Sequence, residues 1–236
     1  CQAFMIINEA RGDITLTPFE FHTLAALYLM QQLPLDVRIL EIGLGGRLDA
    51  VNVVQPDVAV VTSIDIDHAE FLGNTREAIG FEKAGIFRAN RPAVCGDAEP
   101  PKSLVQAAVE LGATFYQQGK QFYFNEKHNS WSWHCIQPEV RIDDLGPSAY
   151  ALSNLSTALM TVTLLQDKLP VTAAQIKTGL SQITLRGRHE VVPGEVTHIF
   201  DVAHNPAAVS LLVKFLQKNP CQGKTHAVFS MLGDKD

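Results

Sequence analysis

Apolar, β-rich runs alternate with helix-forming patterns along this chain, and the alternation restricts the folds that it can adopt. Residues 37–42 (VRILEI) and 56–64 (PDVAVVTSI) are nearly continuous apolar runs, typical of strands buried on both faces of a parallel sheet. A shorter strand is predicted at residues 93–96, and helices are predicted at residues 18–32, 75–87 and 101–111. This order predicts an α/β fold with a doubly wound, mostly parallel sheet.

The second half of the chain departs from that order. Residues 114–142 alternate in short aromatic runs around a polar turn, which favours an antiparallel ribbon at the sheet edge. Helices are predicted at residues 149–168 and 172–182, the second capped by Thr172, and the following segment, rich in Arg and Gly, has no core periodicity. We therefore predict one domain over residues 1–186 and the start of a second over residues 187–236, where strand, turn and helix patterns begin again and Asn205 is the expected cap of the helix.

Composition argues against two classes of partner. The net charge of −6 disfavours a nucleic-acid-binding surface, and no apolar run approaches the roughly 20 residues that cross a bilayer. The four cysteines are widely separated and form no CxxC pair, a pattern that favours reduced thiols in a cytoplasmic protein. We expect neither a nucleic-acid nor a membrane partner.

A carboxylate and a glycine-rich turn directly follow the first apolar run. Glu41 closes this run, and ligands of open α/β sheets bind at such carboxyl ends of strands. The second run continues into TSIDIDHAEFLG, which places His68 just past its end. If the two strands are neighbours, Glu41 and His68 share one sheet edge and can hold a divalent cation. Taken singly, the glycines are explained by a tight turn, and His68 by a hydrogen bond to the backbone. The presence of Glu41 and His68 together favours a metal site.

Lys83 lies on a predicted helix in the otherwise apolar segment FEKAGIFR. A solvated lysine is the ordinary explanation for such a position. Burial, however, lowers the pKa of a lysine and leaves a neutral amine that can react with carbon dioxide. The resulting carbamate is an anionic metal ligand with two oxygens.

Five segments, in this order and spacing, carry a family resemblance: ILEIGLGGRLDAVN, TSIDIDHAEFLG, FEKAGIF, LRGR and FDVAHNP. Together they resemble the folylpolyglutamate synthase and dihydrofolate synthase family of the Mur ligase superfamily, and most closely its bacterial bifunctional members. The resemblance spans essentially the whole chain. It implies a P-loop-NTPase-like central domain over residues 1–186, without its N-terminal P-loop portion, and the start of a Rossmann-like glutamate-ligase domain over residues 187–236.

The resemblance also implies roles for individual residues. The residues that match Glu41 and His68 bind magnesium, and the lysine that matches Lys83 is carbamylated and helps to hold a second magnesium ion near the γ-phosphate. Nucleotide contacts are implied for Asn154, Arg188 and Asp201, and His204 lies in the same motif with a less defined role. The expected catalytic residues are Lys83, His68 and Arg188.

Without the family, the three residues with implied nucleotide contacts have ordinary structural roles. Asn154 is then an exposed polar residue of a helix, Arg188 a solvated linker charge, and Asp201 a residue at a strand end or turn.

Two segments resemble those that line the dihydropteroate pocket of the bifunctional enzymes, and they consist of Thr17, Pro18, Phe19, Glu20, Leu48, Asp49 and Ala50. Asp49 is the expected pterin contact, because a carboxylate accepts hydrogen bonds from the amino and amide groups of the ring. A helix start also explains the first segment, with Thr17 as cap, Pro18 at the first helical position and Glu20 at the third. Phe19 is equally compatible with a core position.

The implied reaction activates a carboxylate of dihydropteroate or a folate by ATP-dependent phosphorylation. The amine of L-glutamate then attacks the acyl phosphate and forms an amide, with ADP and phosphate as the remaining products. Two Mg²⁺ ions and Arg188 are expected to offset phosphate charge, and domain closure to exclude water. The implied partners are ATP, L-glutamate, dihydropteroate and folates, and the implied oligomeric state is a monomer.

The chain departs from the family in one main respect. The P-loop pattern, Gly-x-x-x-x-Gly-Lys-Ser/Thr, is absent, as are an upstream hydroxyl ligand for magnesium and most of the C-terminal domain. We therefore expect the family's N-terminal portion to precede Cys1 in a complete enzyme, and these 236 residues alone not to ligate glutamate.

Three alternatives remain open. They are a folylpolyglutamate synthase without dihydropteroate activity, a peptidoglycan-precursor ligase of the same superfamily, and a non-catalytic nucleotide-binding remnant. The retention of the candidate catalytic and metal-binding residues argues against the last.

Overall fold

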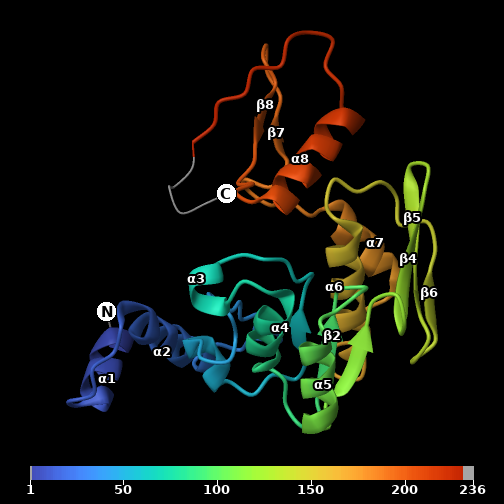
Figure 1. Ribbon diagram of the computed structural model, residues 1–236. Coiled ribbons are helices and arrows are strands. Elements are labelled where there is room, and N and C mark those ends of the chain that lie inside the picture. Colours follow the sequence, from blue (N-terminus) through green and yellow to red (C-terminus); the bar gives the residue numbers. More distant parts are fainter. Residues whose placement is uncertain (1, 231–236) are drawn as a thin grey trace. The chain divides into compact units, whose positions relative to one another are not determined.

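A computed structural model describes residues 2–230 and shows a mixed α/β structure (Figure 1). The chain forms two compact units, which we describe separately. Unit 1 comprises Cys1–Ala59, His68–Ala93 and Pro101–Phe115, and unit 2 comprises Val60–Asp67, Val94–Pro100 and Tyr116–Asp236. No helix among the described residues is long and apolar enough to span a membrane.

Unit 1 is mainly helical. Its helices are α1 (Gln2–Arg11), α2 (Pro18–Gln31), the short 3₁₀ helix η1 (Ala50–Val53), α3 (Ala69–Leu72), α4 (Arg76–Ala84) and α5 (Lys102–Leu111). The start of α2 confirms the prediction: the Thr17 side chain accepts from the Glu20 N–H at 3.3 Å, and the Glu20 carboxylate accepts from the Thr17 N–H at 2.7 Å. This reciprocal capping box satisfies backbone donors that the helix itself leaves unpaired.

Strands β1 (Ala59–Val61), β2 (Pro92–Cys95) and β3 (Thr114–Gln117) form a sheet in the order β1-β2-β3. The Thr114 N–H donates to Arg91 O, and four residues further on the Gln118 N–H donates to Cys95 O. Because both partners advance together, β2 and β3 are parallel. Helices α4 and α5 precede and follow β2 in the chain, so strands and helices alternate as the sequence predicts.

The strand predicted at residues 37–42 is absent, and the prediction is wrong for this run. It has no regular secondary structure and pairs with no strand among residues 2–230. Ile39 is 87% exposed, where a strand buried on both faces would hide it. A run of β-forming residues favours the extended conformation, but a strand forms only where a neighbouring strand pairs with it through hydrogen bonds.

Unit 2 contains the predicted ribbon. Strands β4 (Phe122–Lys127), β5 (Ser130–Cys135) and β6 (Val140–Ile142) form an antiparallel sheet, whereas β3 belongs to the parallel sheet. The fully buried Trp133 donates its indole N–H to Ser156 Oγ of helix α6 (Leu152–Leu164) at 3.1 Å. Helix α7 (Ala173–Ser181) follows and begins at the predicted cap, Thr172.

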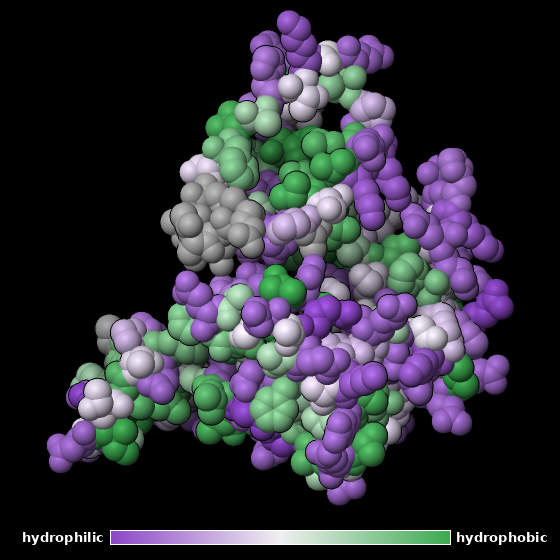
Figure 2. All heavy atoms as spheres, viewed as in Figure 1, coloured by the Kyte–Doolittle hydropathy of each residue, from purple (hydrophilic) through white to green (hydrophobic). Residues whose placement is uncertain are grey.

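The last part of unit 2 is a hairpin and a helix. Strands β7 (Glu190–Val192) and β8 (His198–Phe200) pair antiparallel, and α8 (Pro206–Lys218) begins at the predicted cap, Asn205. Apolar side chains gather on the visible face of these elements (Figure 2), and the exposed ones include Val191, Ile199, Phe200, Val209 and Leu211.

Candidate functional site

The glycine turn after residue 42 packs directly against α4. A side chain at Gly46 would have its Cβ 3.0 Å from Glu82 O and 3.3 Å from the Cα of Lys83. At Gly85, just past α4, a Cβ would lie 2.5 Å from the Cα of Arg47. Both glycines therefore permit a close approach between the turn and the helix that carries Lys83, which is one established use of glycine.

The same turn also approaches α3, which directly follows His68. A Cβ at Gly45 would lie 2.9 Å from Leu72 Cδ2, and Gly45 has a φ of +68° that favours glycine. His68 itself has a φ of +51°, an uncommon conformation for a residue with a side chain. The turn, which begins two residues after Glu41, thus contacts both α3, which follows His68, and α4, which carries Lys83.

Glu41 is exposed, and Lys83 is half-buried on α4. His68 and Lys83 both take part in polar contacts within the structure. Among residues 2–230, no three His, Cys, Asp or Glu side chains group so as to hold a metal ion. A carboxylate and an imidazole from Glu41 and His68 are nevertheless a donor set that suits Mn²⁺ and, for the carboxylate, Mg²⁺.

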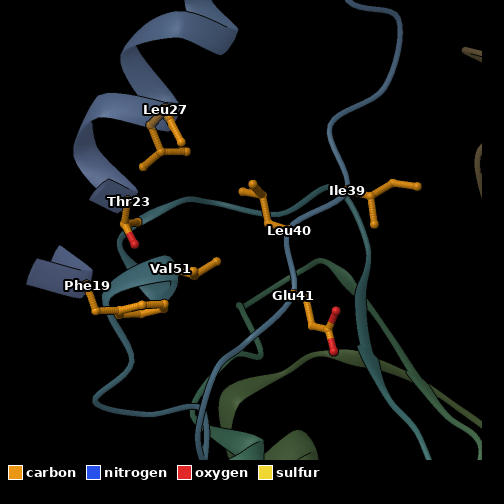
Figure 3. A pocket seen from close by; sticks show the side chains of 8 residues that line it. Phe19, Thr23, Leu27, Ile39, Leu40, Glu41 and Val51 are labelled. Atoms are coloured by element: carbon orange, nitrogen blue, oxygen red, sulfur yellow. The ribbon is translucent and has the colours of Figure 1, made fainter. Parts of the chain in front are cut away.

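A pocket of about 160 Å³ lies between α2, η1 and the segment before the glycine turn (Figure 3). Leu40 points toward Leu27 and the side of α2, whereas Ile39 and Glu41 point to the opposite side of their segment. The lining is largely apolar and consists of Phe19, Thr23, Ala26, Leu27, Ile39, Leu40, Glu41 and Val51. Of the predicted dihydropteroate residues, Phe19 alone lines this pocket, while η1, which contributes Val51, begins at Ala50.

Asp49 has a clear structural role. Its Oδ2 accepts from the N–H groups of Gly43 and Leu44, both at 3.0 Å, and its Oδ1 accepts from the Val51 N–H at 2.9 Å. These bonds close the glycine turn and cap η1. Since a carboxylate oxygen offers about two acceptor positions, Oδ1 keeps one for a ligand. Leu48, next to it, is 91% exposed.

The predicted nucleotide residues lie in unit 2. Asp201 accepts from the His189 N–H at 2.9 Å and from the Ala203 N–H at 2.8 Å. Arg188 therefore adjoins a residue that Asp201 holds, and its own side chain is exposed. Asn154 is exposed in the first turn of α6. These contacts bring Arg188 and Asp201 into one small region.

His204 contacts a residue next to the candidate metal ligand His68. Its Nε2 lies 3.9 Å from Asp67 Oδ2, and the neighbouring Asn205 side chain donates to the same oxygen at 3.5 Å. The FDVAHNP segment (residues 200–206) therefore contacts the end of the segment IDID (residues 64–67) within unit 2.

Sequence reasoning missed three residues around these sites. Arg88 holds the segment after the glycine turn, and Tyr150 and His189 hold the segment that carries Arg188. Each of them directly adjoins a motif in the sequence: Arg88 follows FEKAGIF, Tyr150 precedes ALSN and His189 follows LRGR. This adjacency could have marked them as candidates. The chain also contains Gly223-Lys224-Thr225, but Lys218 occupies the position of the first P-loop glycine, and no helix begins there among the described residues.

Known protein domains match both parts of the chain. The Mur ligase middle domain matches residues 5–133, and the Mur ligase glutamate ligase domain matches residues 187–236.

Individual relatives match almost the whole chain but only about half of their own length. The dihydrofolate synthase/folylpolyglutamate synthase of Escherichia coli (strain K12) is 43% identical over 234 residues, or 99% of this chain and 54% of that protein. The folylpolyglutamate synthase of Lacticaseibacillus casei is 30% identical over 98% of this chain and 56% of its own length.

Solved structures of similar proteins also match the fold of this chain. E. coli FolC in complex with DHPP and ADP aligns with a TM-score of 0.93 at 42% identity, covering 99% of this chain and 56% of that one. A bifunctional folylpolyglutamate synthase/dihydrofolate synthase with Mn, AMPPNP and L-glutamate bound aligns with a TM-score of 0.90 at 46% identity, covering 99% and 56%. This chain belongs to the Mur ligase family, and over almost its whole length it is similar to dihydrofolate synthase/folylpolyglutamate synthases, of which it spans about half.

Proposed function

We propose that this chain forms part of an ATP-dependent carbon–nitrogen ligase that joins L-glutamate to dihydropteroate and to folates. The observation that carries the proposal is its 43% identity, over 99% of its length, to a dihydrofolate synthase/folylpolyglutamate synthase. Structures of such relatives hold ADP with DHPP, or AMPPNP with Mn and L-glutamate, which are ligands or analogues for each part of this reaction.

For the metal site, we propose that Glu41 and His68 hold a magnesium ion and that a carbamylated Lys83 helps to hold a second. Support comes from the glycine turn, which contacts both the α3 segment after His68 and the Lys83 backbone. When bound, the ions would offset the negative charge of the phosphate groups. The carboxylate of Glu41 and the imidazole of His68 would orient the first ion, while Lys83, half-buried on α4, would contribute the two oxygens of its carbamate to the second.

For the nucleotide, we propose contacts from Asn154, Arg188 and Asp201, with His204 nearby. The exposed guanidinium of Arg188 supplies a fixed positive charge for a phosphate group. Asp201 accepts from the N–H of His189, the residue after Arg188, and so helps to fix the backbone from which Arg188 extends.

For the second substrate, we propose that dihydropteroate binds between the start of α2 and η1. The pocket there is largely apolar, and Phe19 offers an aromatic face for a flat ring. The free acceptor position on Asp49 Oδ1 is available to a ring N–H, and the exposed Leu48 gives further apolar contact. Thr17 and Glu20 act through the helix cap, which fixes Phe19 together with Pro18.

The proposed domain division follows the sequence. Residues 1–186 form part of a P-loop-NTPase-like, doubly wound central domain, and residues 187–236 begin a Rossmann-like glutamate-ligase domain. The domain matches at residues 5–133 and 187–236 support a boundary near Arg186. Free thiols at Cys95, Cys135 and Cys221 support the expected cytoplasmic setting.

A hybrid enzyme tests the function. The matching segment of the E. coli relative is replaced by residues 1–236 of this chain, and ADP and dihydrofolate are measured with ATP, Mg²⁺, L-glutamate and dihydropteroate as the sole acceptor. We expect dihydrofolate from the hybrid, and none from the 236-residue chain alone. Glutamylation of folates but not dihydropteroate would indicate a folylpolyglutamate synthase only. ATP binding without ligation of any acceptor would favour a non-catalytic remnant.

A further inference from the structure

The hydroxyl of Tyr150 holds the linker that leads to Arg188. It donates to Ile183 O at 3.4 Å and accepts from the Leu185 N–H at 3.1 Å. A tyrosine hydroxyl has one proton to donate and lone pairs to accept, so this single group satisfies two backbone groups of the linker. The contact joins segments more than thirty residues apart in the sequence.

The residue before Tyr150 holds the far end of the same linker. Ala149 O lies 2.8 Å from Nδ1 of His189, and the His189 ring stacks on Phe215 of α8 with centroids 4.5 Å apart and planes 8° apart. Residues 149 and 150 together therefore fix residues 183–189 at both ends. The His189 side chain is only 14% exposed, which makes this a well-packed anchor.

Arg188 lies between the two anchors with a fixed backbone and an exposed side chain. Its N–H donates to Leu185 O at 3.2 Å, and the adjacent Gly187 donates to Glu190 Oε2 at 2.8 Å. Its guanidinium makes no hydrogen bond or ion pair with another residue of the described part of the chain. The structure thus fixes the base of Arg188 and leaves its charge available.

The segment that contains Tyr150 also leads into the first turn of α6, where Asn154 is exposed. The Tyr150 backbone is itself fixed, because its N–H donates to Ser148 Oγ at 3.0 Å and its carbonyl accepts from the same hydroxyl at 3.2 Å. Only three residues separate Tyr150 from Asn154. One short segment thereby sets the spacing between the Asn154 end of α6 and the linker that carries Arg188.

We propose that Tyr150 is a positioning residue for nucleotide binding, which holds the Arg188 linker in register with Asn154. This inference rests on the proposed function, since it takes both residues as contacts of a nucleoside triphosphate. A guanidinium on a fixed backbone loses less conformational freedom on binding phosphate than one on a mobile linker. Tyr150 acts through Arg188 and touches no reacting atom.

The test replaces Tyr150 with Phe in the hybrid enzyme, which keeps the ring and removes both hydroxyl bonds. We expect KM for ATP to rise about fivefold, as for the loss of neutral hydrogen bonds, with kcat changed less than about twofold. KM for L-glutamate stays unchanged. In an Arg188→Ala background, Tyr150→Phe has no further effect, because its role passes through that side chain. Tyr123→Phe is the matched control, since Tyr123 lies on β4 and its hydroxyl donates to Lys120 O, three residues away in the sequence and not in the linker.

The outcomes separate this inference from the proposed function. An unsubstituted hybrid without ligase activity would overturn the function itself. An active hybrid in which Tyr150→Phe leaves KM for ATP unchanged, or multiplies the effect of Arg188→Ala, would overturn the positioning role.

Folding is checked in the hybrid enzyme by hydrogen exchange, where Tyr150→Phe should speed exchange of the Leu185 amide and leave the other amides unchanged. If that variant does not fold, His189→Phe provides the same test. It keeps an aromatic ring to stack on Phe215, and it removes both the bond to Ala149 and the 3.7 Å contact between His189 Nε2 and Asp201 Oδ2. It should raise KM for ATP with little change in kcat. An unchanged KM in this variant would likewise overturn the inference.

Discussion

Arg88 binds both oxygens of Asn52: its Nη2 lies 2.7 Å from the Asn52 backbone oxygen and 2.8 Å from Asn52 Oδ1. Asn52 in turn donates its side-chain amide to Gly85 O at 3.1 Å. The segment after the glycine turn is therefore fixed to the segment after α4. The glycine turn with its following segment and the helix that carries Lys83 are thus packed together, although they lie more than thirty residues apart in the sequence.

We expect Arg88→Lys to destabilise unit 1 by about 2 kcal/mol, because a single ammonium cannot replace the several directed donors of the half-buried guanidinium. Urea denaturation of the 236-residue chain measures the change. The control is Arg141→Lys, whose exposed pair with Asp143 is screened by solvent and should contribute little to stability. Equal effects of the two substitutions would contradict the role of the Arg88 contacts.

Two glycine substitutions should have opposite signs. Gly85→Ala places a Cβ 2.5 Å from the Arg47 backbone, so we expect destabilisation by about 2 kcal/mol or more. Gly179→Ala, inside α7 with no atom within 4 Å of the new Cβ, should stabilise by roughly 0.5–1 kcal/mol through helix propensity. The measurement is the thermal unfolding midpoint of each variant compared with that of the parent chain. A higher midpoint for Gly85→Ala would show that the turn does not pack on this helix end.

Glu77 should make stability depend on acidic pH. The Ser103 and Lys102 backbone N–H groups, which donate to it at 2.8 and 3.0 Å, lower the pKa of the Glu77 carboxyl below its ordinary 4.5. A carboxyl whose folded-state pKa is depressed stabilises the protein above its unfolded pKa. That contribution is lost as the pH falls from about 4.5 through the lower folded-state pKa.

The measurement is the thermal midpoint between pH 6 and pH 3, with Glu77→Gln expected to flatten its decline. Glu110→Gln, on the same helix α5 that Glu77 caps, is the matched control. A decline that is as steep in Glu77→Gln as in the parent would rule out this carboxyl as a source of the dependence.

Phe19→Ala should impair acceptor binding selectively. In the hybrid enzyme we expect KM for dihydropteroate to rise about tenfold, because the aromatic face of the pocket is lost, while KM for ATP is unchanged. Val109→Ala removes an exposed apolar side chain of α5 and serves as control. Parallel rises in both KM values would indicate general damage rather than a lost pocket wall.

Glu41→Gln and His68→Ala should each raise the Mg²⁺ concentration needed for half-maximal activity of the hybrid by at least about tenfold. Removing a charged or basic ligand weakens ion binding, whereas a purely structural role would lower activity at every Mg²⁺ concentration. Titration of Mg²⁺ after treatment with a chelator measures this. Unchanged Mg²⁺ dependence in both variants would exclude these two residues as ligands.

Local patterns were enough to predict the starts of several helices, whereas α1 and α3 were not predicted. Thr17 and Glu20 form the predicted capping box, and Thr172 and Asn205 cap the helices predicted to follow them. Such interactions span three or four residues, so the chain carries them wherever it folds. The order of the five motifs likewise indicated the family, which the domain matches confirm.

Tertiary structure decided what the patterns leave open. Residues 37–42 have strand-forming side chains but no paired neighbour in the described chain, and pairing is a property of two segments. The glycines after them proved to be contact points for α3 and α4, which no spacing in the sequence states.

Tyr150 and His189 illustrate the same limit, because their partners lie more than thirty residues away in the sequence. The sequence by itself determined the starts of several helices, the alternation of elements and the family. Which distant segments meet, and therefore which side chains hold Arg188 and the glycine turn, was decided only by folding, since those contacts depend on the path of the whole chain.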